Sequence, residues 1–340
     1  MKHIKLCVIF ALCYSTIHLL AQLPPELPKG VEIHSYTGWG DCVYLNASER
    51  PVQVVIVPDV GGRIVHYSFG EENILFENSA SQGKTLAGSG GYLWVGGYQC
   101  DVGPDIRGIP THDQLLLGKY QWSSTRPFFA KVTSEIDSTL GIQMEKEFVV
   151  APDTGDLGLL QRLKNSGKED KSFCLWDRTA CKNGGFVFFP VKSASRYPNG
   201  WAALKDKDNM KFFDGVTPNS PEVRVVDGIL ISETVGKTTR IGSDSDAGWM
   251  AYVKGKLLFI KYFPCDPKAN YTEEGNTVEF YFDYQILEFG PLSPEHKLTP
   301  GQSCEYPEKW VLVGLKKEVT TVEQVRKLVS KVKSSPFKKR

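Results

Sequence analysis

A carboxylate, Glu288, stands where a run of strand-forming residues, 277–289, meets a glycine and a proline. Glu279 and Asp283 lie earlier, inside the same run. A strand end followed by a turn lets a rigid sheet present a charged group to a pocket, where a carboxylate suits proton transfer. If this chain carries out chemistry, Glu288 is the first residue to test.

A second candidate is Arg63, which follows the glycine pair Gly61-Gly62 after a β-branched run, 52–57. Paired glycines permit backbone conformations that other residues avoid, and Arg63 beside them is a forked hydrogen-bond donor. The alternative is a tight hairpin with a surface arginine. His66 alternates with Ile64, which is also typical of a packed side chain.

The segment 88–105 is rich in glycine and aromatic residues, contains Trp94, and is followed by Arg107 and His112. Flat aromatic faces beside charged side chains suit a sugar, whose C–H faces stack on rings while its hydroxyls need polar partners. The segment is no phosphate loop, because it lacks the Lys-Ser/Thr ending and a following helix. Alternatively, the glycines only let strands cross closely.

The segment 173–185 contains a Trp-Asp-Arg sequence. Strand alternation places Trp176 and Arg178 on one face and Asp177 on the other, with Lys182 further along. Trp176, Arg178 and Lys182 are therefore candidates for lining a pocket. An ordinary strand with one exposed salt bridge is the alternative.

Many short strands must position these groups. Apolar and β-branched runs occupy 52–57, 128–134, 141–150, 159–164, 186–191, 222–226, 249–253, 257–263 and 278–284. Turn signals lie at 59–62, 165–167, 183–185, 254–256 and 274–276. This pattern predicts an all-β protein, a large antiparallel β-sandwich in one domain over residues 22–316.

A short C-terminal helix and basic tail are expected at 317–340. Thr320 and Glu323 fit a capping box, and valines and leucines at helical spacing form one apolar face. The basic cluster of the tail is short and terminal, so we interpret it as a solvated segment.

Residues 1–21 have the basic start, short apolar run and small final residue of a secretory signal peptide. We therefore expect export to the periplasm or the extracellular space and no stable membrane insertion after cleavage. Removing Lys2 and Lys5 from the 40 basic residues leaves 38 against 39 acidic ones. This near-neutral balance disfavours a nucleic-acid partner. The oligomeric state is left open.

Six cysteines follow the signal segment, and their wide spacing does not form a small-scaffold disulfide framework. Buried thiols and one or two disulfides both fit. No cluster of His and Cys indicates zinc, and the pair Asp101 and Asp105 in a glycine-rich segment is more typical of solvated carboxylates. The sequence thus predicts no metal and no cofactor.

Several of these segments together resemble the domain-of-unknown-function family numbered 4380, of the galactose-mutarotase-like superfamily. The residues that carry the resemblance lie at 36–40, 57–64, 90–94, 176, 184–185, 248–252, 287–291, 298–301 and 310. The resemblance implies a β-supersandwich whose large twisted sheets carry a sugar-binding face.

In aldose 1-epimerases of that superfamily, a Leu-Glu stretch followed by a Leu-x-Pro-Gly turn supplies the base, and Glu288 looks like that residue. Two histidines serve there as ring-oxygen ligand and proton donor. Here Leu93-Trp94 stands where one histidine is expected, and the segment with Trp176 and Arg178 has none. His112, Lys182 and Arg178 remain as substitutes, although arginine is a poor proton donor.

These observations support two principal hypotheses. One is an exported carbohydrate-active enzyme, such as an epimerase-like isomerase, with Glu288 as general base and His112 as its partner. The other is a non-catalytic carbohydrate-binding protein, or a structural β-sandwich module. In both sugar-binding cases Arg63, Trp94, Trp176, Arg178 and Lys182 are expected to contact a carbohydrate.

Overall fold

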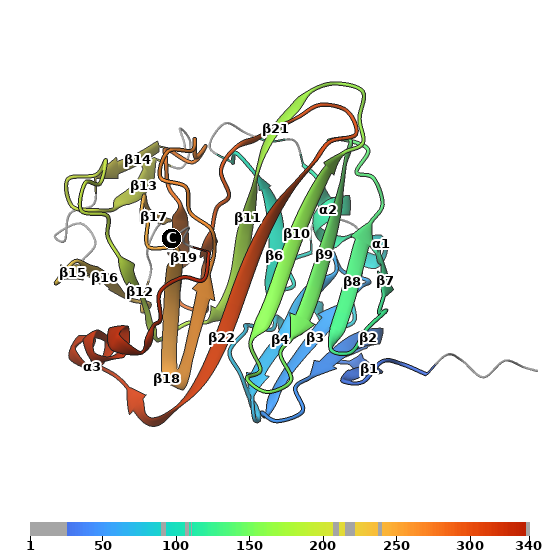
Figure 1. The fold of residues 1–340 in the computed structure, drawn as a ribbon, viewed down its shortest axis with the longest axis horizontal. Coiled ribbons are helices and arrows are strands. Elements are labelled where there is room, and N and C mark those ends of the chain that lie inside the picture. Colours follow the sequence, from blue (N-terminus) through green and yellow to red (C-terminus); the bar gives the residue numbers. More distant parts are fainter. Residues whose placement is uncertain are drawn as a thin grey trace, which may run out of the picture.

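The computed structural model describes residues 26–89, 93–105, 109, 111–206, 211–214, 222–236 and 240–337. The predicted signal segment 1–21, Arg107 and the last three residues of the basic tail lie outside these ranges. The described chain forms two antiparallel β-sheets that pack face to face (Figure 1). The predicted all-β sandwich is therefore confirmed.

The first sheet has 13 strands, and the ordered path β1-β2-β3-β4-β6-β11-β20-β19-β17-β13-β14 runs through it. Strands β5 and β21 lie off this path and pair with β4 and β11, respectively. The strands are β1 (Val31–Tyr36), β2 (Trp39–Asn46), β3 (Val52–Val57), β4 (Arg63–Phe69), β5 (Glu72–Asn73), β6 (Tyr98–Gly103), β11 (Lys171–Lys182), β13 (Ala202–Asp206), β14 (Lys211–Asp214), β17 (Ile241–Ser243), β19 (Val278–Phe282), β20 (Ile286–Pro291) and β21 (His296–Leu298).

The second sheet has nine strands in the order β15-β16-β12-β18-β22-β10-β9-β8-β7. Its strands are β7 (Tyr120–Ser123), β8 (Phe129–Ser134), β9 (Ile142–Val150), β10 (Leu157–Asn165), β12 (Phe186–Pro190), β15 (Val223–Val226), β16 (Ile229–Glu233), β18 (Trp249–Tyr262) and β22 (Ser303–Val319). Short helices connect or end the strands: η1 (Ser79–Ser81), α1 (Leu86–Ser89), α2 (Asp113–Leu117), α3 (Val322–Leu328) and η2 (Val329–Lys331).

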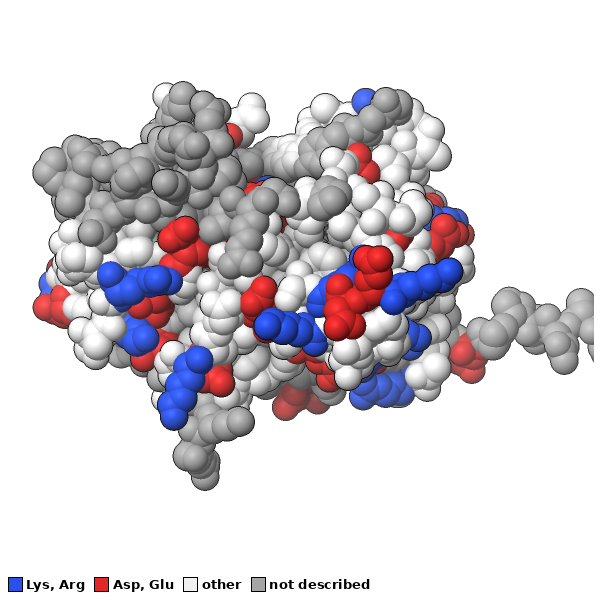
Figure 2. Space-filling model, turned by 90° about the horizontal axis from the view of Figure 1, so that it is seen from above, with Lys and Arg blue, Asp and Glu red and all other residues white. Residues whose placement is uncertain are grey.

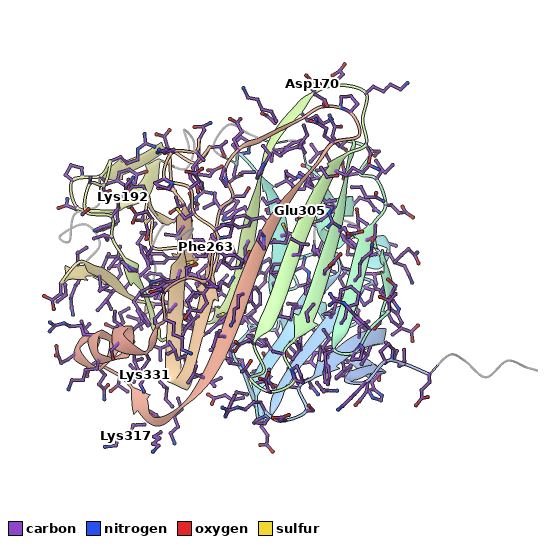
Figure 3. All side chains as sticks on the ribbon, in the orientation of Figure 1. Asp170, Lys192, Phe263, Glu305, Lys317 and Lys331 are labelled. Carbon is purple, nitrogen blue, oxygen red and sulfur yellow. The ribbon has the colours of Figure 1, made fainter. Side chains whose placement is uncertain are left out.

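The core lies between the sheets, where alternate side chains of each strand meet, as Figure 3 shows. Strand β9 is typical, because its residues alternate between buried and half-buried along its whole length. Trp310 on β22 is fully buried and packs edge-on against Tyr98 of the first sheet, with ring centroids 5.4 Å apart. Aromatic burial of this kind is a large apolar contribution to the stability of the sandwich.

A buried ion pair crosses this core. Lys261 on β18 places its ammonium 2.7 Å from Asp177 on β11, and both side chains are wholly buried. The same ammonium donates to the Thr179 hydroxyl at 2.6 Å and to the Phe289 carbonyl at 3.2 Å. One cation thereby joins β18 of the second sheet to β11 and β20 of the first.

A buried carboxyl lies beside this ion pair. Burial raises the pKa of Glu308 on β22 well above its usual value, and the negative charge of Asp177 adds to the effect. The Oε1 atom of Glu308 accepts from Gln161 at 2.7 Å and its Oε2 atom from Trp310 at 2.9 Å. The Glu308 carboxyl is thus hydrogen-bonded within the core although it is buried.

Two predicted boundaries were wrong. The turn expected at 254–256 is part of the continuous strand β18, with a register shift between Gly255 and Leu257. The run 277–289 is divided between two strands, because Asp283 accepts hydrogen bonds from the backbone of Gln285 and Ile286 and closes a turn between β19 and β20. Glu288 therefore lies inside β20 and not at a strand end.

The C-terminal helix forms as expected, with its cap one residue later. Thr321 caps α3 in a capping box with Gln324, in place of the predicted Thr320 and Glu323. The tail also departs from the solvated segment that we expected. The Lys333 amide donates to the Tyr262 hydroxyl at 3.2 Å, and Ser335 is buried. The tail thus docks on the sandwich at least as far as these residues.

The surface carries charges of both signs, interspersed over the face shown in Figure 2. None of the helices in the described ranges has the length and apolar character that a bilayer span requires. The six cysteines of the described chain are free thiols, and all except Cys265 are buried. The sequence allowed either buried thiols or one or two disulfides, and the structure has thiols, most of them buried.

The inter-sheet ion pair yields a stability prediction. Lys261→Met leaves Asp177 buried without its cation, so we expect a loss of roughly 3–5 kcal/mol in the free energy of unfolding, measured by urea denaturation. Lys309→Met is the matched control, because Lys309 pairs with Asp156 at 2.7 Å while 40% exposed. It should lose no more than about 1 kcal/mol. Equal losses in the two variants would contradict the prediction.

Candidate functional site

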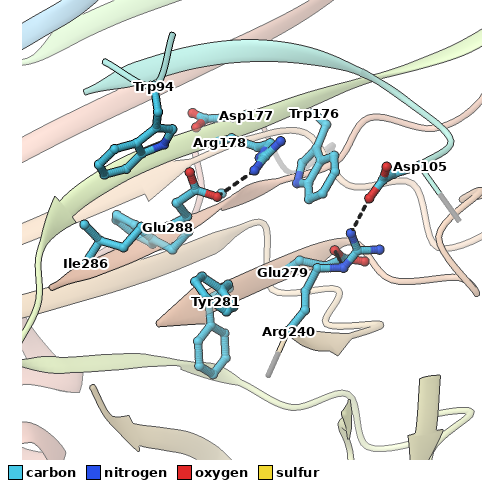
Figure 4. Close-up of a pocket in the computed structure, with 13 residues that line it drawn as sticks. Trp94, Asp105, Trp176, Asp177, Arg178, Arg240, Glu279, Tyr281, Ile286 and Glu288 are labelled. Carbon is cyan, nitrogen blue, oxygen red and sulfur yellow. Dashed lines mark hydrogen bonds and ion pairs between the residues drawn. The ribbon is translucent and has the colours of Figure 1, made fainter. Parts of the chain in front are cut away.

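A cavity of about 400 Å³ opens on the first sheet where β11, β20 and β19 run side by side. It lies on the face turned away from the inter-sheet core. Figure 4 shows most of the side chains that surround it. Its lining residues are Trp94, Asp105, Trp176, Asp177, Arg178, Arg240, Glu279, Phe280, Tyr281, Ile286, Glu288, Phe289 and Gly290.

Alternation along β11 determines which groups reach the cavity. Asp177 and Thr179 contact Lys261 in the core. Trp176 and Arg178 therefore point to the opposite face, as the sequence predicted. Trp176 is paired with Asp101 on β6, and Ala180 is paired with Glu288 on β20. The wall of the cavity is thus a rigid, hydrogen-bonded sheet.

Arg178 bridges two carboxylates. Its Nη1 atom donates to Asp101 Oδ2 at 3.0 Å, and its Nη2 atom donates to Glu288 Oε2 at 2.8 Å. Burial lowers the pKa of Arg178, but the charges of Glu288 and Asp101 outweigh it and raise the pKa above its ordinary value. The guanidinium is consequently a permanent cation that fixes the position of Glu288.

Glu288 has one oxygen engaged by Arg178, and its side chain is 14% exposed. In register it lies opposite Ala180 on β11 and Tyr281 on β19. Gly290 follows two residues later on the same face. A Cβ at Gly290 would collide with the Asp177 carbonyl oxygen, so glycine allows β20 and β11 to approach closely here.

Behind Arg178, His112 contacts Asp101. Its Nε2 atom lies 2.8 Å from Asp101 Oδ1, and both residues are buried. Burial raises the pKa of Asp101, but the hydrogen bond to His112 and the charge of Arg178 outweigh it and lower the pKa to about 2. His112 is not among the lining residues. It is linked to Glu288 through Asp101 and Arg178.

The two tryptophans have different surroundings. Trp176 is 6% exposed, and the guanidinium carbons of Arg178 and Arg240 each lie 5.0 Å from its ring centroid. Its ring is already used in cation–π contacts. Trp94 is half-buried and packs against Phe76, with ring centroids 5.2 Å apart. Trp94 is therefore the better aromatic surface for a ligand.

Sequence reasoning missed the charged group at the other end of the cavity. Arg240, just before β17, donates to Asp105 at 2.7 Å and to Glu273 at 2.9 Å. Its Nε atom lies 3.0 Å from Glu279. No sequence motif around Arg240 indicates that it lines a site. Glu279 could have been found from the sequence, because alternation along 278–282 places it on the same face as Tyr281.

The structure does not bring Arg63 and Lys182 to the cavity. Arg63 is 1% exposed and donates to the carbonyl oxygens of Val60, Gly96 and Leu116. Its hydrogen bonds join the turn at Val60 to Gly96 and to α2, beside Gly61, a glycine with φ of +71° at which a Cβ would collide with the Leu116 carbonyl. Lys182 is exposed at the end of β11. Neither side chain lines the cavity.

Of the predicted residues, the cavity therefore unites Trp94, Trp176, Arg178 and Glu288. Among the described residues, no group of three or more His, Cys, Asp and Glu side chains has the arrangement of a metal site. The chemistry that the cavity offers is aromatic stacking, hydrogen bonding by ion-paired groups, and proton transfer by carboxyls.

Solved structures show which class of protein has this fold. A galactose mutarotase related enzyme from Lactobacillus acidophilus is 10% identical, with a TM-score of 0.54 over 81% of this chain and 99% of that one. A protein named as a candidate aldose 1-epimerase from Escherichia coli K12 is also 10% identical, with a TM-score of 0.56 over 81% of this chain and 100% of that one. The chain therefore has a galactose mutarotase-like fold.

The family follows from the sequence. The model of the family "Domain of unknown function (DUF4380)" matches residues 123–313, more than half of the chain. The protein belongs to this family, and the predicted resemblance is confirmed. No curated protein gives a significant match. Because the sequence identities to these solved structures are near 10%, the structural similarity shows a shared fold and nothing more.

The lowered pKa of Asp101 yields a prediction about acid stability. A folded-state pKa of about 2, against an ordinary value of 3.8, adds stability that is present above about pH 4 and lost as the pH falls toward 2. The difference in unfolding free energy between the wild type and Asp101→Asn should thus shrink by roughly 1–2 kcal/mol over that range. Denaturant unfolding at several pH values measures it. A constant difference would contradict the expectation.

Proposed function

We propose that the protein binds a neutral sugar in the cavity between Trp94, Glu288 and Arg240. The observation that carries this proposal is the presence, in one cavity, of the half-buried Trp94 ring and several ion-paired polar groups. Sugars are bound through stacking of their C–H faces and through hydrogen bonds to fixed polar partners. The galactose mutarotase-like fold supports the same class of ligand.

Figure 4 shows Glu288, held by Arg178, below Trp94 in the cavity. Because Arg178 holds one Glu288 oxygen at 2.8 Å, the carboxylate is fixed before a ligand arrives. A fixed acceptor loses little conformational entropy on binding. We propose that Glu288 accepts a hydrogen bond from a sugar hydroxyl while the ring stacks on Trp94.

The charges in the cavity support a neutral ligand. Within the described chain, Arg178 is matched by Asp101 and Glu288, and Arg240 lies among three further carboxylates. An acidic sugar would meet these carboxylates, and among the described lining residues each arginine is already paired with carboxylates; like charges in a partly buried site repel strongly. The cavity is therefore better suited to neutral hexoses and pentoses than to uronic acids or sugar phosphates.

Titration calorimetry with a sugar panel tests the ligand class. Neutral aldoses should bind, while glucuronic acid and glucose 6-phosphate should bind at least about tenfold more weakly because of charge repulsion. Glucose and glucuronic acid form a matched pair, since they differ only at C6. Preference for the acidic member would overturn the proposed ligand class, and failure of every sugar to bind would overturn the proposed function.

The stacking role of Trp94 predicts a specific loss of affinity. Trp94→Ala should weaken binding of a neutral sugar by about tenfold, since aromatic stacking contributes roughly 0.5–1.5 kcal/mol beyond burial. Tyr284→Ala is the control, because Tyr284 is 74% exposed in the β19–β20 turn and does not line the cavity. It should bind as the wild type does. Equal affinities for all three proteins would exclude Trp94 as the stacking surface.

A further inference from the structure

The cavity has two ends, and an arginine holds a carboxylate at each of them. Arg178 donates to Glu288 Oε2 at 2.8 Å, and Arg240 donates to Asp105 Oδ2 at 2.7 Å. Figure 4 shows these two pairs on either side of Trp176. All five residues line the cavity. The site therefore repeats one arrangement, a carboxylate held by an arginine, at two places.

Each of the two carboxylates has a second oxygen left for a ligand. Within the described chain, Glu288 Oε1 and Asp105 Oδ1 accept no hydrogen bond. Neither oxygen is buried without a partner, so both are open to solvent. The Asp105 side chain is 43% exposed and that of Glu288 is 14% exposed. A hydroxyl of a bound sugar can therefore donate to either carboxylate.

Asp105 is fixed in place as firmly as Glu288 is. Its backbone amide donates to Glu273 at 2.6 Å, and Glu273 in turn accepts from Arg240 at 2.9 Å. Because Glu273 is fully buried, these bonds tie the end of the segment after β6 to the protein interior. An acceptor that is already fixed loses little conformational entropy when a ligand binds.

The two carboxylates are too far apart for one sugar ring to contact both. In register, Glu288 lies opposite Ala180 of β11. Gly103, two residues before Asp105, lies opposite Cys174 of the same strand, on its other side. Six residues separate these positions, or roughly 20 Å along the strand. Side chains that lean inward shorten this span, yet Figure 4 shows an indole ring between the two carboxylates. One ring beside Glu288 therefore leaves the Asp105 end unfilled.

The volume of the cavity also suits a ligand longer than one ring. The cavity measures about 400 Å³. Pockets of roughly 300–1,000 Å³ take drug-sized ligands, which have about twice as many non-hydrogen atoms as one hexose. Tyr281 is half-buried and lines the cavity, so part of its ring adds to the apolar surface that Trp94 provides.

We propose that the cavity binds a neutral saccharide of at least two rings. One ring stacks on Trp94 beside Glu288, and the next ring donates a hydroxyl to Asp105 at the other end. This inference rests on the proposed function, because it requires a neutral sugar in the cavity. It narrows the ligand to a disaccharide or to a segment of a longer neutral chain.

Titration calorimetry on the full-length protein compares sugars of one ring and two rings. Glucose, galactose and mannose are measured beside maltose, cellobiose, lactose, melibiose and mannobiose, which join these sugars by different linkages. At least one disaccharide should bind about tenfold or more tightly than each monosaccharide that it contains, because the second ring adds a hydrogen bond to a charged group. This comparison uses the wild type alone and does not depend on the folding of a variant.

Asp105→Ala tests the assignment of the second ring. The preference for the disaccharide over its monosaccharides should fall below about threefold, since the variant removes the acceptor of that ring. Trp94→Ala should weaken both kinds of sugar by a similar factor and keep the preference. Asp59→Ala is the matched control, because Asp59 is 34% exposed, pairs with Lys119 at 2.9 Å and does not line the cavity. It should bind as the wild type does.

The outcomes separate the two proposals. If monosaccharides bind and no disaccharide binds more tightly than they do, the two-ring ligand is overturned and sugar binding is left intact. A preference that persists in Asp105→Ala, or that falls equally in Asp59→Ala, overturns the role of Asp105. Absence of binding by every sugar of either size overturns both proposals. Equal melting temperatures confirm that the variants are folded.

Discussion

The Lys261 ammonium, buried between the sheets with Asp177, is the interaction on which the placement of the site depends. It joins β18 to β11 and also donates to the Phe289 carbonyl on β20. Because Asp177 is held in the core, its neighbours Trp176 and Arg178 must face the other way. A charge pair inside the sandwich thus determines which side chains form the cavity outside it.

The ion pairs of the cavity are of two kinds: Arg178 and Glu288 lie on the strands β11 and β20, whereas Arg240 and Glu273 lie in connecting segments. Arg178 holds Glu288 from the neighbouring strand, and Arg240 gathers carboxylates at the opposite end. Strand-borne groups keep their geometry, since each is fixed by backbone pairing on both sides. The arginines therefore hold the carboxyl groups in position and offset part of their negative charge.

Much of the fold followed from local patterns. The strand predicted at 52–57 has the same limits as β3. Alternation along β11 also placed Trp176 and Arg178 on one face of the sheet and Asp177 on the other. The errors arose where a turn signal and a strand signal occurred in the same segment, and the sequence pattern did not show which of the two would prevail. Lys254-Gly-Lys256 resembles a turn but continues β18 with a register shift, and the Asp283 side chain breaks a β-rich run by capping a turn.

The sequence by itself determined the sandwich class, the family resemblance and the facing of Trp176 and Arg178, because periodicity and motif order are properties of the chain alone. Only the tertiary structure decided that Arg63 supports a loop and that Arg240, Glu273 and Glu279 share one site. These groups come from segments that pair across the sheet. Their charges and proton affinities depend on distance and burial, which exist only after folding.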